Sequence, residues 1–530
     1  MINRIKFRSS TRWLAVIVWT SFSSALLWAV MVPLWHFPDE QAHFAQVQNY
    51  AELGRSPETN NDLSFEIYES ERLLGTLRNN LGRNEFTYHP EFKIEYTDTL
   101  MGKDEGYLKS LPVSTRTDFI KQESPRYPPL YYYWVALGYR FGYQGDLFTR
   151  VLFTRLASIA LFVTLVTGGW FMAREVFPNQ PWRWASLGII LSFHPMLSFV
   201  SSGINNDVLM NLLGTFLSLT MMVVLRRGVN FKRILALLGL VVAGIFTKQL
   251  IYLLIPPVAM ILAWSLMSTR QKQGKGILFL AVLAILIFTF RLSLISFMRR
   301  GGFWLPFWPE VSPASPGYSL SFKILLSQRI SQLYRETLVW YWGVYKWLGV
   351  VLSLSTIRLI KVAILASLAG WISYWAQIIK RRRLSVTDRQ LLVLILTNGF
   401  YLLGLVVWDI FLTRSMGFAH GLQGRYFFPL IASQMLLLLA GWFWLLERWF
   451  SPQKIFLLIG GSFLILFLIA FWRVMESYYQ LVPFITFIRQ VSQYKPGFAK
   501  WPYLVVYWVL FIISLGGIFY TSVKFRKGNK

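Results

Sequence analysis

Asp39, Glu40 and His43 are the residues of this chain whose types and spacing best suit acid-base chemistry. They lie in the string Phe-Pro-Asp-Glu-Gln-Ala-His, directly after a long apolar run near the N-terminus. On a helix, Asp39 and His43 share one face, whereas the neighbours Asp39 and Glu40 point about 100° apart. A carboxylate held at the end of a membrane span is partly removed from water and can act as a general base.

The same string also suits an ordinary helix start. Pro38 fits the first position of a helix, and acidic residues beside it favour the positive end of the helix dipole. Gly54 then provides a stop signal. The string therefore predicts a helix from about Pro38 to Gly54 whether or not it carries chemistry.

The composition is that of a polytopic membrane protein. Of 530 residues, 55% are hydrophobic and 17% are aromatic, while 15% are charged; soluble domains carry about 25% charge. Several apolar runs exceed the roughly 18 residues at which a membrane span becomes the better reading. The chain has no cysteine, which excludes disulfides and thiolate metal sites.

Twelve apolar runs predict twelve transmembrane helices. They lie near 13–34, 149–172, 184–200, 204–225, 234–247, 249–268, 277–298, 358–379, 390–412, 426–446, 455–472 and 502–522. Lys and Arg cluster in alternate short connections, and the positive-inside rule then places both termini in the cytoplasm. The first run is longer than a signal-peptide core of about 7 to 15 residues, which predicts an anchor that stays.

We therefore expect an all-α integral membrane protein in three parts. Residues 1–34 hold the cytoplasmic N-terminus and first span, and residues 35–147 form a large extracytoplasmic loop. Residues 148–530 form a multi-span bundle with outer loops near 299–357, 413–425 and 475–500. Two aromatic segments, 125–143 and 336–350, predict helices in the outer membrane interface.

The loop over 35–147 differs in charge from the rest of the chain. It holds 17 of the 25 acidic residues and 11 basic ones, whereas the remainder has 42 basic and 8 acidic residues. The basic excess lies in short clusters between apolar runs, so it reflects topology and attraction to anionic lipid headgroups. Nothing in this distribution calls for nucleic acid as a partner.

Four motifs in order make the chain resemble a known family. PDEQAHF follows the first span, ESPRYPPLYYYW closes the loop, and HPMLSFVSSGINND and HGLQGRYFFPL come later. Together, over residues 13 to 445, they resemble a bacterial multi-spanning family related to the GT-C glycosyltransferases, which include protein O-mannosyltransferases and the lipid A aminoarabinose transferase. The resemblance implies a polyprenyl-phosphate sugar donor and an acidic motif in the first outer loop.

The implied reaction moves a sugar to a hydroxyl or amine of an envelope glycan, lipid or protein at the outer face of the plasma membrane. Direct displacement at the anomeric carbon inverts its configuration and requires one base. We predict Asp39 as that base, with Glu40 as the alternative base or as an acceptor-orienting group. His43 orients Asp39, binds donor phosphate, or holds a divalent metal ion with both carboxylates; the sequence leaves the metal open, and a hydrogen-bonded interfacial histidine is an equal alternative.

Arg425 is the predicted phosphate ligand. It begins a late span on the outer side, and a guanidinium binds phosphate oxygens in pairs; the alternative is snorkelling to the interface. Arg126 and Lys248 are weaker candidates. Lys248 separates two apolar runs, so a solvated loop lysine is its simpler explanation, and Arg126 could reach a lipid headgroup without any catalytic role.

Asp207 is a rare carboxylate in the apolar half of the chain. With its neighbours Asn205 and Asn206 it could hydrogen-bond sugar hydroxyls or the acceptor, and it could equally cap the span that begins near Ile204. Asp409 and Arg414 could pair with each other and receive no role.

A transporter or lipid flippase is the alternative function, because it also explains many spans with buried polar groups. Such proteins show internal duplication with matching interrupted spans, and this sequence has neither in clear form. A noncatalytic envelope scaffold fits the composition but leaves the acidic motif unexplained.

Overall fold

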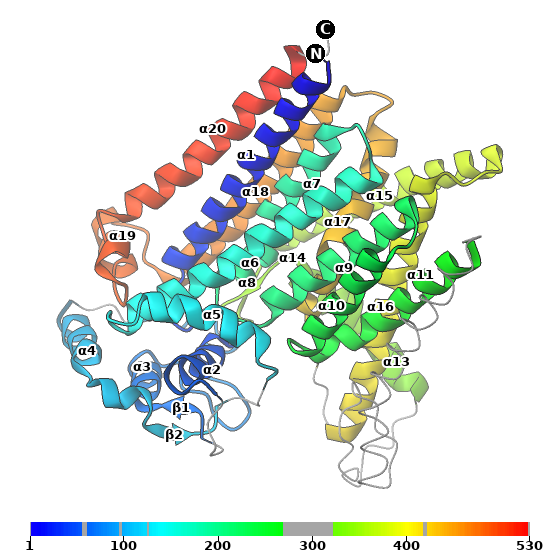
Figure 1. Cartoon of the computed structure of the whole chain (residues 1–530). Helices are drawn as coiled ribbons and strands as arrows, with labels where there is room; N and C mark the ends of the chain where they lie inside the picture. Colours follow the sequence, from blue (N-terminus) through cyan, green and yellow to red (C-terminus); the bar gives the residue numbers. More distant parts are fainter. Residues whose placement is uncertain are drawn as a thin grey trace, which may run out of the picture.

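The computed structural model describes residues 2–55, 61–94, 98–123, 127–268, 322–416 and 421–527. Within these ranges the long helices lie side by side in a bundle, and the first large loop folds into a smaller helical unit at one end of it (Figure 1). The all-helical membrane class predicted from composition is confirmed.

The bundle helices are α1 (Ile2–Met31), α6 (Leu147–Val176), α7 (Pro181–Phe193), α8 (Pro195–Ser202), α9 (Asp207–Arg227), α10 (Phe231–Ile245), α11 (Ile255–Ser268), α13 (Phe322–Gln332), α14 (Leu338–Trp342), α15 (Leu354–Arg381), α16 (Val386–Met416), α17 (Ile431–Leu446), α18 (Pro452–Tyr478) and α20 (Leu504–Lys527). Short 3-10 turns cover Val113–Arg116, Gln249–Leu254, Gly424–Leu430 and Gly497–Ala499, and a π turn covers Leu333–Thr337.

The loop unit contains α2 (Glu40–Leu53), α3 (Phe65–Leu73), α4 (Asp98–Ser110), α5 (Leu130–Phe141) and a hairpin of β1 (Leu63–Ser64) with β2 (Phe119–Lys121). A second antiparallel hairpin pairs β3 (Val344–Tyr345) with β4 (Val350–Val351), and α19 (Phe484–Val491) precedes the last bundle helix. α5 lies within the first predicted aromatic segment and packs on both α2 and α6, so it joins the loop unit to the bundle.

The predicted count of twelve spans is not confirmed. Among the described residues, eight helices are long and apolar enough to cross a membrane, and the bent pair α7–α8 makes nine. α10, with 15 residues, and the apolar stretch Gln249–Trp264 are each shorter than a span, because a crossing needs about 20 helical residues. The run predicted at 277–298 lies outside the described residues.

A proline causes the bend between α7 and α8. Pro195 has no backbone N–H to donate and its ring clashes with the preceding turn, and the two helices meet at 60°. His194 caps the second helix, because its Nδ1 accepts a hydrogen bond from the backbone N–H of Leu197 at 3.2 Å. After α8, the chain continues into the polar residues at the start of α9.

The second predicted interfacial helix, 336–350, is corrected by the structure. α14 ends at Trp342, and the chain then turns into the β3–β4 hairpin. Lys346, Trp347 and Leu348 all have positive φ, a backbone conformation that cannot continue a right-handed helix. Lys346 holds the turn in place by donating to the backbone carbonyls of Pro90 at 3.0 Å and Ser477 at 2.8 Å.

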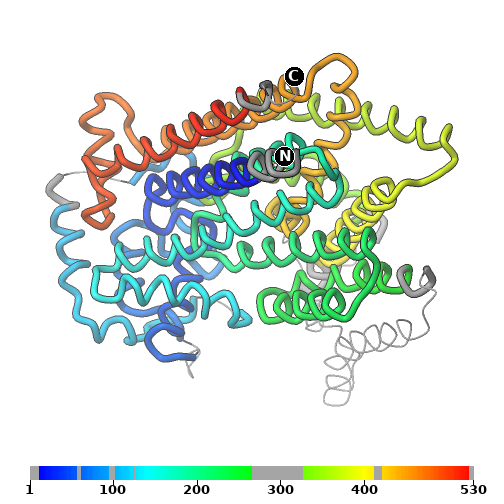
Figure 2. The backbone as a smooth tube through the Cα atoms, turned by 45° about the horizontal axis from the view of Figure 1, so that its top comes forward, coloured from blue at the N-terminus to red at the C-terminus, as the bar shows by residue number. Residues whose placement is uncertain are grey.

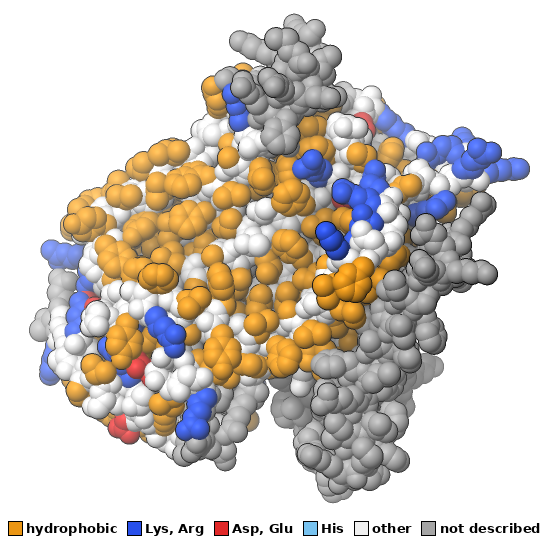
Figure 3. Space-filling view, viewed as in Figure 1, with side chains coloured by type: hydrophobic (Ala, Val, Ile, Leu, Met, Phe, Trp, Pro, Cys, Tyr) orange, Lys and Arg blue, Asp and Glu red, His pale blue; other side chains and the backbone are white. Residues whose placement is uncertain are grey.

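The outer surface of the bundle matches a lipid environment. Figure 3 shows a broad apolar surface over α20, α1 and α6, and on α20 the exposed side chains include Val509, Ile512, Ile513 and Phe519. Figures 1 and 2 both show α1 and α20 running side by side, and these two helices pack together. The start of α1 and the end of α20 lie at the same end of the bundle (Figure 1).

We expect Gly441→Val to separate α15 from α17. A Cβ at Gly441 would lie 2.2 Å from the backbone oxygen of Ser367, and one at Gly370 would lie 1.8 Å from the oxygen of Gly441. Such overpacking costs about 1–3 kcal/mol, which a lower melting temperature in detergent would report. Gly461→Val on α18 is the control, because a Cβ there meets nothing within 4 Å; equal losses in the two variants would contradict this packing.

Candidate active site

Asp39 sits at the junction between α1 and the loop unit, in a strained backbone conformation. It is the residue before α2 and has φ 56° and ψ 23°, in the left-handed region. Aspartate tolerates this region better than most residues, at some energetic cost, and such positions concentrate at functional sites. The Asp39 side chain does not cap α2, so its carboxylate is available to other partners. The predicted stop at Gly54 is confirmed, with φ 73°.

Two arginines hold the Asp39 carboxylate. Arg425 Nη2 donates to Asp39 Oδ2 at 2.8 Å, and Arg78 Nη1 lies 3.3 Å from Oδ1. Withdrawal from water pushes the pKa of Asp39 up, but the combined attraction of Arg425 and Arg78 outweighs this and holds the pKa below its ordinary value. The carboxylate is 37% exposed. It is therefore an ionised group within reach of a ligand.

Asp207 is the second carboxylate of the site, as the first residue of α9. Its side chain is buried and forms an ion pair with Lys248, and its Oδ2 lies 3.9 Å from Arg425 Nε. Lys248 thus contacts a carboxylate, in contrast to the simpler reading as a solvated loop lysine. We call Asp39, Asp207, Lys248 and Arg425 the charged site.

Close backbone packing brings these four residues together. Gly214 of α9 lies against the turn that carries Arg425, because a Cβ there would be 2.0 Å from the backbone oxygen of Pro429. A Cβ at Gly424 would likewise lie 2.1 Å from the backbone N of Tyr341. Asn205 ties the start of α9 to the Asp39 junction by donating from its side chain to the Pro38 carbonyl at 3.1 Å.

Several buried polar groups at the site have no hydrogen-bond partner among the residues described. They are Nε and Nη1 of Arg425 and the whole side-chain amide of Asn206. A buried polar group left unsatisfied costs about 1–3 kcal/mol, and such groups call for a functional explanation. The charged site therefore offers free donors on a cation beside two carboxylates, an arrangement that suits an anionic, hydroxyl-rich ligand.

Glu40 has different partners from its neighbour Asp39. Its side chain is fully buried, and both oxygens accept hydrogen bonds from Arg155, at 2.8 and 2.7 Å. Arg155 also donates to the carbonyls of Ala29 at 2.7 Å and Pro33 at 3.2 Å. This pair fastens α2 to the end of α1 and to α6. The structure thus brings Asp39, Asp207, Lys248 and Arg425 together and places Glu40 in a separate ion pair.

His43 lies beside the charged site on α2, a helix that is buried from Glu40 to Tyr50. Its Nδ1 is 2.8 Å from the Tyr132 hydroxyl, and its ring stacks on Tyr127 with centroids 5.4 Å apart. Burial lowers the pKa of His43 to about 3, and Lys248 lowers it as well, while the two nearby carboxylates oppose the shift. The imidazole is neutral at pH 7, which favours orienting contacts over binding of phosphate by a cationic ring.

The residues considered for a divalent metal do not fit one. Both oxygens of Glu40 are taken by Arg155, and His43 Nδ1 is taken by Tyr132. In the described part of the chain, no group of three or more His, Asp or Glu side chains is arranged to hold a metal ion.

Two site residues were missed by the sequence analysis. Arg78, in the coil after α3, bridges Asp39 and Glu123, with Nε 2.5 Å from Glu123 Oε1; no motif marks it. Arg155 carries a signal, because a charge inside an apolar run needs a partner.

The Asp409 side chain pairs with Arg329 at 3.1 Å. Arg126 lies outside the described residues.

Comparison with known proteins identifies one family. The family model described as "Predicted membrane protein (DUF2142)" matches residues 22–434. No curated protein matches the sequence. Among solved structures, the crystal structure of ArnT from Cupriavidus metallidurans in the apo state is similar, with 16% identity and a TM-score of 0.41. The alignment covers 86% of this chain and 62% of that one, so this chain spans less than two thirds of the ArnT structure.

We expect Glu40→Gln to destabilise the fold. Removing one partner of a buried ion pair leaves an uncompensated charge and costs about 3–5 kcal/mol, so the melting temperature in detergent should fall clearly. Glu476→Gln is the matched control, since the side chains of Glu476 and its partner Arg473 are 55% and 47% exposed and a surface pair contributes about 0–1 kcal/mol. Similar losses in both variants would contradict the anchoring role of Glu40.

The low pKa of His43 predicts a loss of stability on acidification. Because its folded pKa, about 3, lies below the unfolded value near 6.5, the unfolded chain binds the proton first. Stability then falls as pH drops from about 6.5 towards 3, by at most about 1.4 kcal/mol per pH unit. Melting of the wild type and of His43→Gln at pH 7 and pH 5 checks this. The variant should lose less on acidification, and an equal loss would count against the assignment.

Proposed function

The chain belongs to the DUF2142 family of predicted membrane proteins, and from this premise we propose that it is a membrane glycosyltransferase. It transfers a sugar from a polyprenyl-phosphate-linked donor to an envelope glycan, lipid or protein, at the outer face of a bacterial plasma membrane. The motif resemblance to GT-C enzymes supports this donor class, and the charged site supports the chemistry.

The observation that carries the proposal is the position of Arg425 between two carboxylates. Arg425 bonds Asp39 through Nη2, while its Nη1 has no hydrogen-bond partner among the described side chains. A guanidinium with free donors is a strong ligand for phosphate oxygens. Lys248 adds a second positive charge, since it is paired with Asp207 in the same cluster.

The proposed step is a displacement at the anomeric carbon. The acceptor oxygen forms the new bond to that carbon as the bond to the phosphate oxygen breaks, and the electron pair leaves with the polyprenyl phosphate. The acceptor proton passes to the Asp39 carboxylate, and Arg425 and Lys248 stabilise the additional negative charge on the phosphate. Attack opposite the leaving group inverts the sugar configuration.

Arg425 also regulates the strength of the base in this scheme. The ion pairs with Arg425 and Arg78 lower the pKa of Asp39, which makes it a weak proton acceptor. Donor phosphate competes with Asp39 for the guanidinium. As that ion pair weakens, the pKa of Asp39 rises, so the base becomes effective only when the donor is bound.

The buried residues at the start of α9 provide the sugar contacts. Asn206 has an unsatisfied side-chain amide, and Asp207 Oδ2 makes no hydrogen bond among the described residues. Hydroxyl groups of a sugar can both donate to Asp207 and accept from Asn206. Satisfying such groups gives strong discrimination, because a ligand without matching hydroxyls leaves them unpaired.

Asp39→Asn should abolish transfer while leaving the fold intact. Asparagine keeps the shape and tolerates the left-handed backbone, but it cannot accept the proton, so we expect a rate loss of about 100-fold or more. The assay measures transfer of labelled sugar from a panel of undecaprenyl-phosphate sugars to an envelope extract, with melting temperature as the folding readout. Glu69→Gln, in the loop unit, is the carboxylate control and should keep its activity.

Arg425→Lys tests whether donor binding needs the paired donors of the guanidinium or only its positive charge. Lysine keeps the positive charge and loses the paired donors, so donor KM should rise and the rate should fall. Transfer that survives in Asp39→Asn would overturn Asp39 as the base. Absence of transfer from every donor, together with lipid or solute movement in vesicles, would overturn the transferase and favour a transporter.

A further inference from the structure

The segment 479–503 connects two membrane spans. It begins after α18, whose span ends at Tyr478, and it ends where the span of α20 begins, at Leu504. Both ends of the segment are therefore at the level of a membrane surface. The loop unit lies at the same surface, because the backbone N–H of Tyr494 donates to Glu105 of α4 at 3.2 Å. The segment contains α19 and the turn Gly497–Ala499, and it has no acidic residue.

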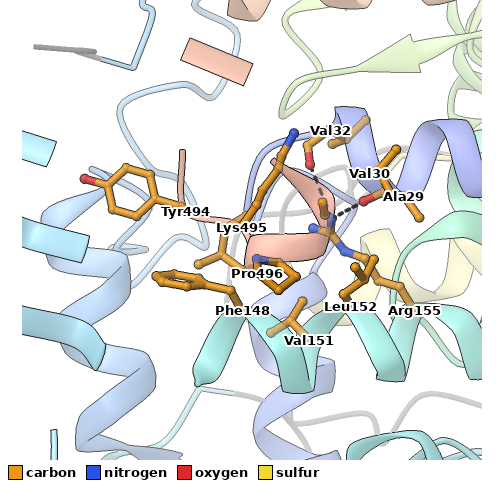
Figure 4. Close-up of a pocket in the computed structure, with 12 residues that line it drawn as sticks. Ala29, Val30, Val32, Phe148, Val151, Leu152, Arg155, Tyr494, Lys495 and Pro496 are labelled. Carbon is orange, nitrogen blue, oxygen red and sulfur yellow. Dashed lines mark hydrogen bonds between the residues drawn. The ribbon is translucent and has the colours of Figure 1, made fainter. Parts of the chain in front are cut away.

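The inner side of this segment packs against the bundle. Figure 4 shows Tyr494 and Pro496 beside the first turns of α6, where they line a narrow cavity together with Phe148. The rings of Phe148 and Tyr494 lie 6.0 Å apart. In α19, the buried side chains are Ile488 and Val491. Contacts within the chain thus fix one side of the segment.

The outer side of the segment is apolar and exposed. The exposed fraction ranges from 43% for Phe498 to 79% for Val482. We call this surface the apolar rim, and it consists of Val482, Phe484, Ile485, Phe498, Trp501 and Tyr503. The rings of Phe484 and Trp501 lie 6.4 Å apart, so the start of α19 and the residues before α20 form one surface. A contiguous apolar patch on the outside of a protein marks a contact with a membrane or with another protein.

The apolar rim continues into the lipid-facing surface of the bundle. Val505 and Val506, in the first turn of α20, are exposed directly after Tyr503, and Figure 3 shows apolar side chains along that helix. Phe498 contacts Phe153 in the span formed by α6, with ring centroids 6.1 Å apart. Tryptophan and tyrosine gather where a membrane meets water, and the rim carries one of each just before α20. Continuity with two spans favours lipid over a protein partner.

We propose that the apolar rim inserts into the lipid at the membrane surface and anchors the loop unit there. The link to the loop unit is Lys500, which lies between Phe498 and Trp501 in the sequence and forms an ion pair with Glu105 of α4. The hydrogen bond from the Tyr494 backbone to Glu105 is a second link. α4 is thus held by a segment that lipid holds in turn. This inference does not depend on the proposed function.

The absence of cysteine from the chain allows a single spin label to report on the rim. The label is attached to Ile485→Cys in the full chain, in nanodiscs of phosphatidylcholine and phosphatidylglycerol. Oxygen dissolves in lipid, whereas a nickel chelate stays in water. We expect the ratio of oxygen to nickel accessibility to be about threefold or more above that of the control. The control is Ile120→Cys on β2, which is 39% exposed and lies on the side of the loop unit away from the bundle (Figure 1).

Two results of this measurement would overturn the proposal. Equal ratios at positions 485 and 120 would show that the rim lies in water. Low accessibility of the label at position 485 to both oxygen and the nickel chelate would show that protein covers the rim, such as a second copy of the chain.

A second measurement tests the anchoring of the loop unit. Ile485→Glu places a charge in the rim, which makes its insertion into lipid unfavourable; Ile485 is 57% exposed, so little packing is lost. We expect backbone hydrogen exchange in α4 to become about twofold or more faster in nanodiscs, because Glu105 loses a fixed partner. Ile120→Glu is the matched control and should leave this exchange unchanged. Unchanged exchange in α4, or an equal increase in both variants, would overturn the anchoring.

Discussion

The position of Arg425 between Asp39 and Asp207 is the interaction on which the rest of the site depends. Two carboxylates brought together at the end of a bundle repel each other unless a cation separates them. Arg425 contacts Asp39 directly and lies 3.9 Å from Asp207 through Nε. It thereby links the loop unit, the start of α9 and the start of α17 in one electrostatic unit. The absence of a side chain at Gly214 and Gly424 permits the close backbone approach that brings this unit together.

The adjacent residues Asp39 and Glu40 divide two tasks that one carboxylate could not perform together. Glu40 is fully buried and has both oxygens bonded to Arg155. It therefore fixes the start of α2, and its oxygens are not available to accept a proton. Asp39 retains 37% of its exposure and sits on a strained backbone. The strain at Asp39 is tolerable because the next residue is anchored so firmly.

Part of the site could be predicted from sequence because charged residues within or at the ends of apolar runs need polar partners. Asp39 and Arg425 were predicted from their positions at the ends of apolar runs, and Asp207 as a rare carboxylate in the apolar half of the chain. The structure brings the three together. Lys248 was predicted less well, since its partner is 41 residues away in sequence and only tertiary packing reveals it. Arg78 has no local signal at all. The number of spans could not be read from hydropathy, because an apolar run of 15 residues such as α10 scores like part of a crossing.

The anchoring of Arg155 to the backbone of α1 has a mechanical consequence. Its donors hold the carbonyls of Ala29, Val32 and Pro33, and Glu40 is bonded to the same guanidinium. The position of the Asp39 carboxylate relative to the membrane is therefore set by the first membrane helix and not by the loop unit that surrounds it. Bilayers thicker or thinner than the apolar length of a helix make it tilt, and here any tilt of that helix moves Asp39 with it. The position of Asp39 relative to the membrane surface therefore depends on the thickness of the bilayer.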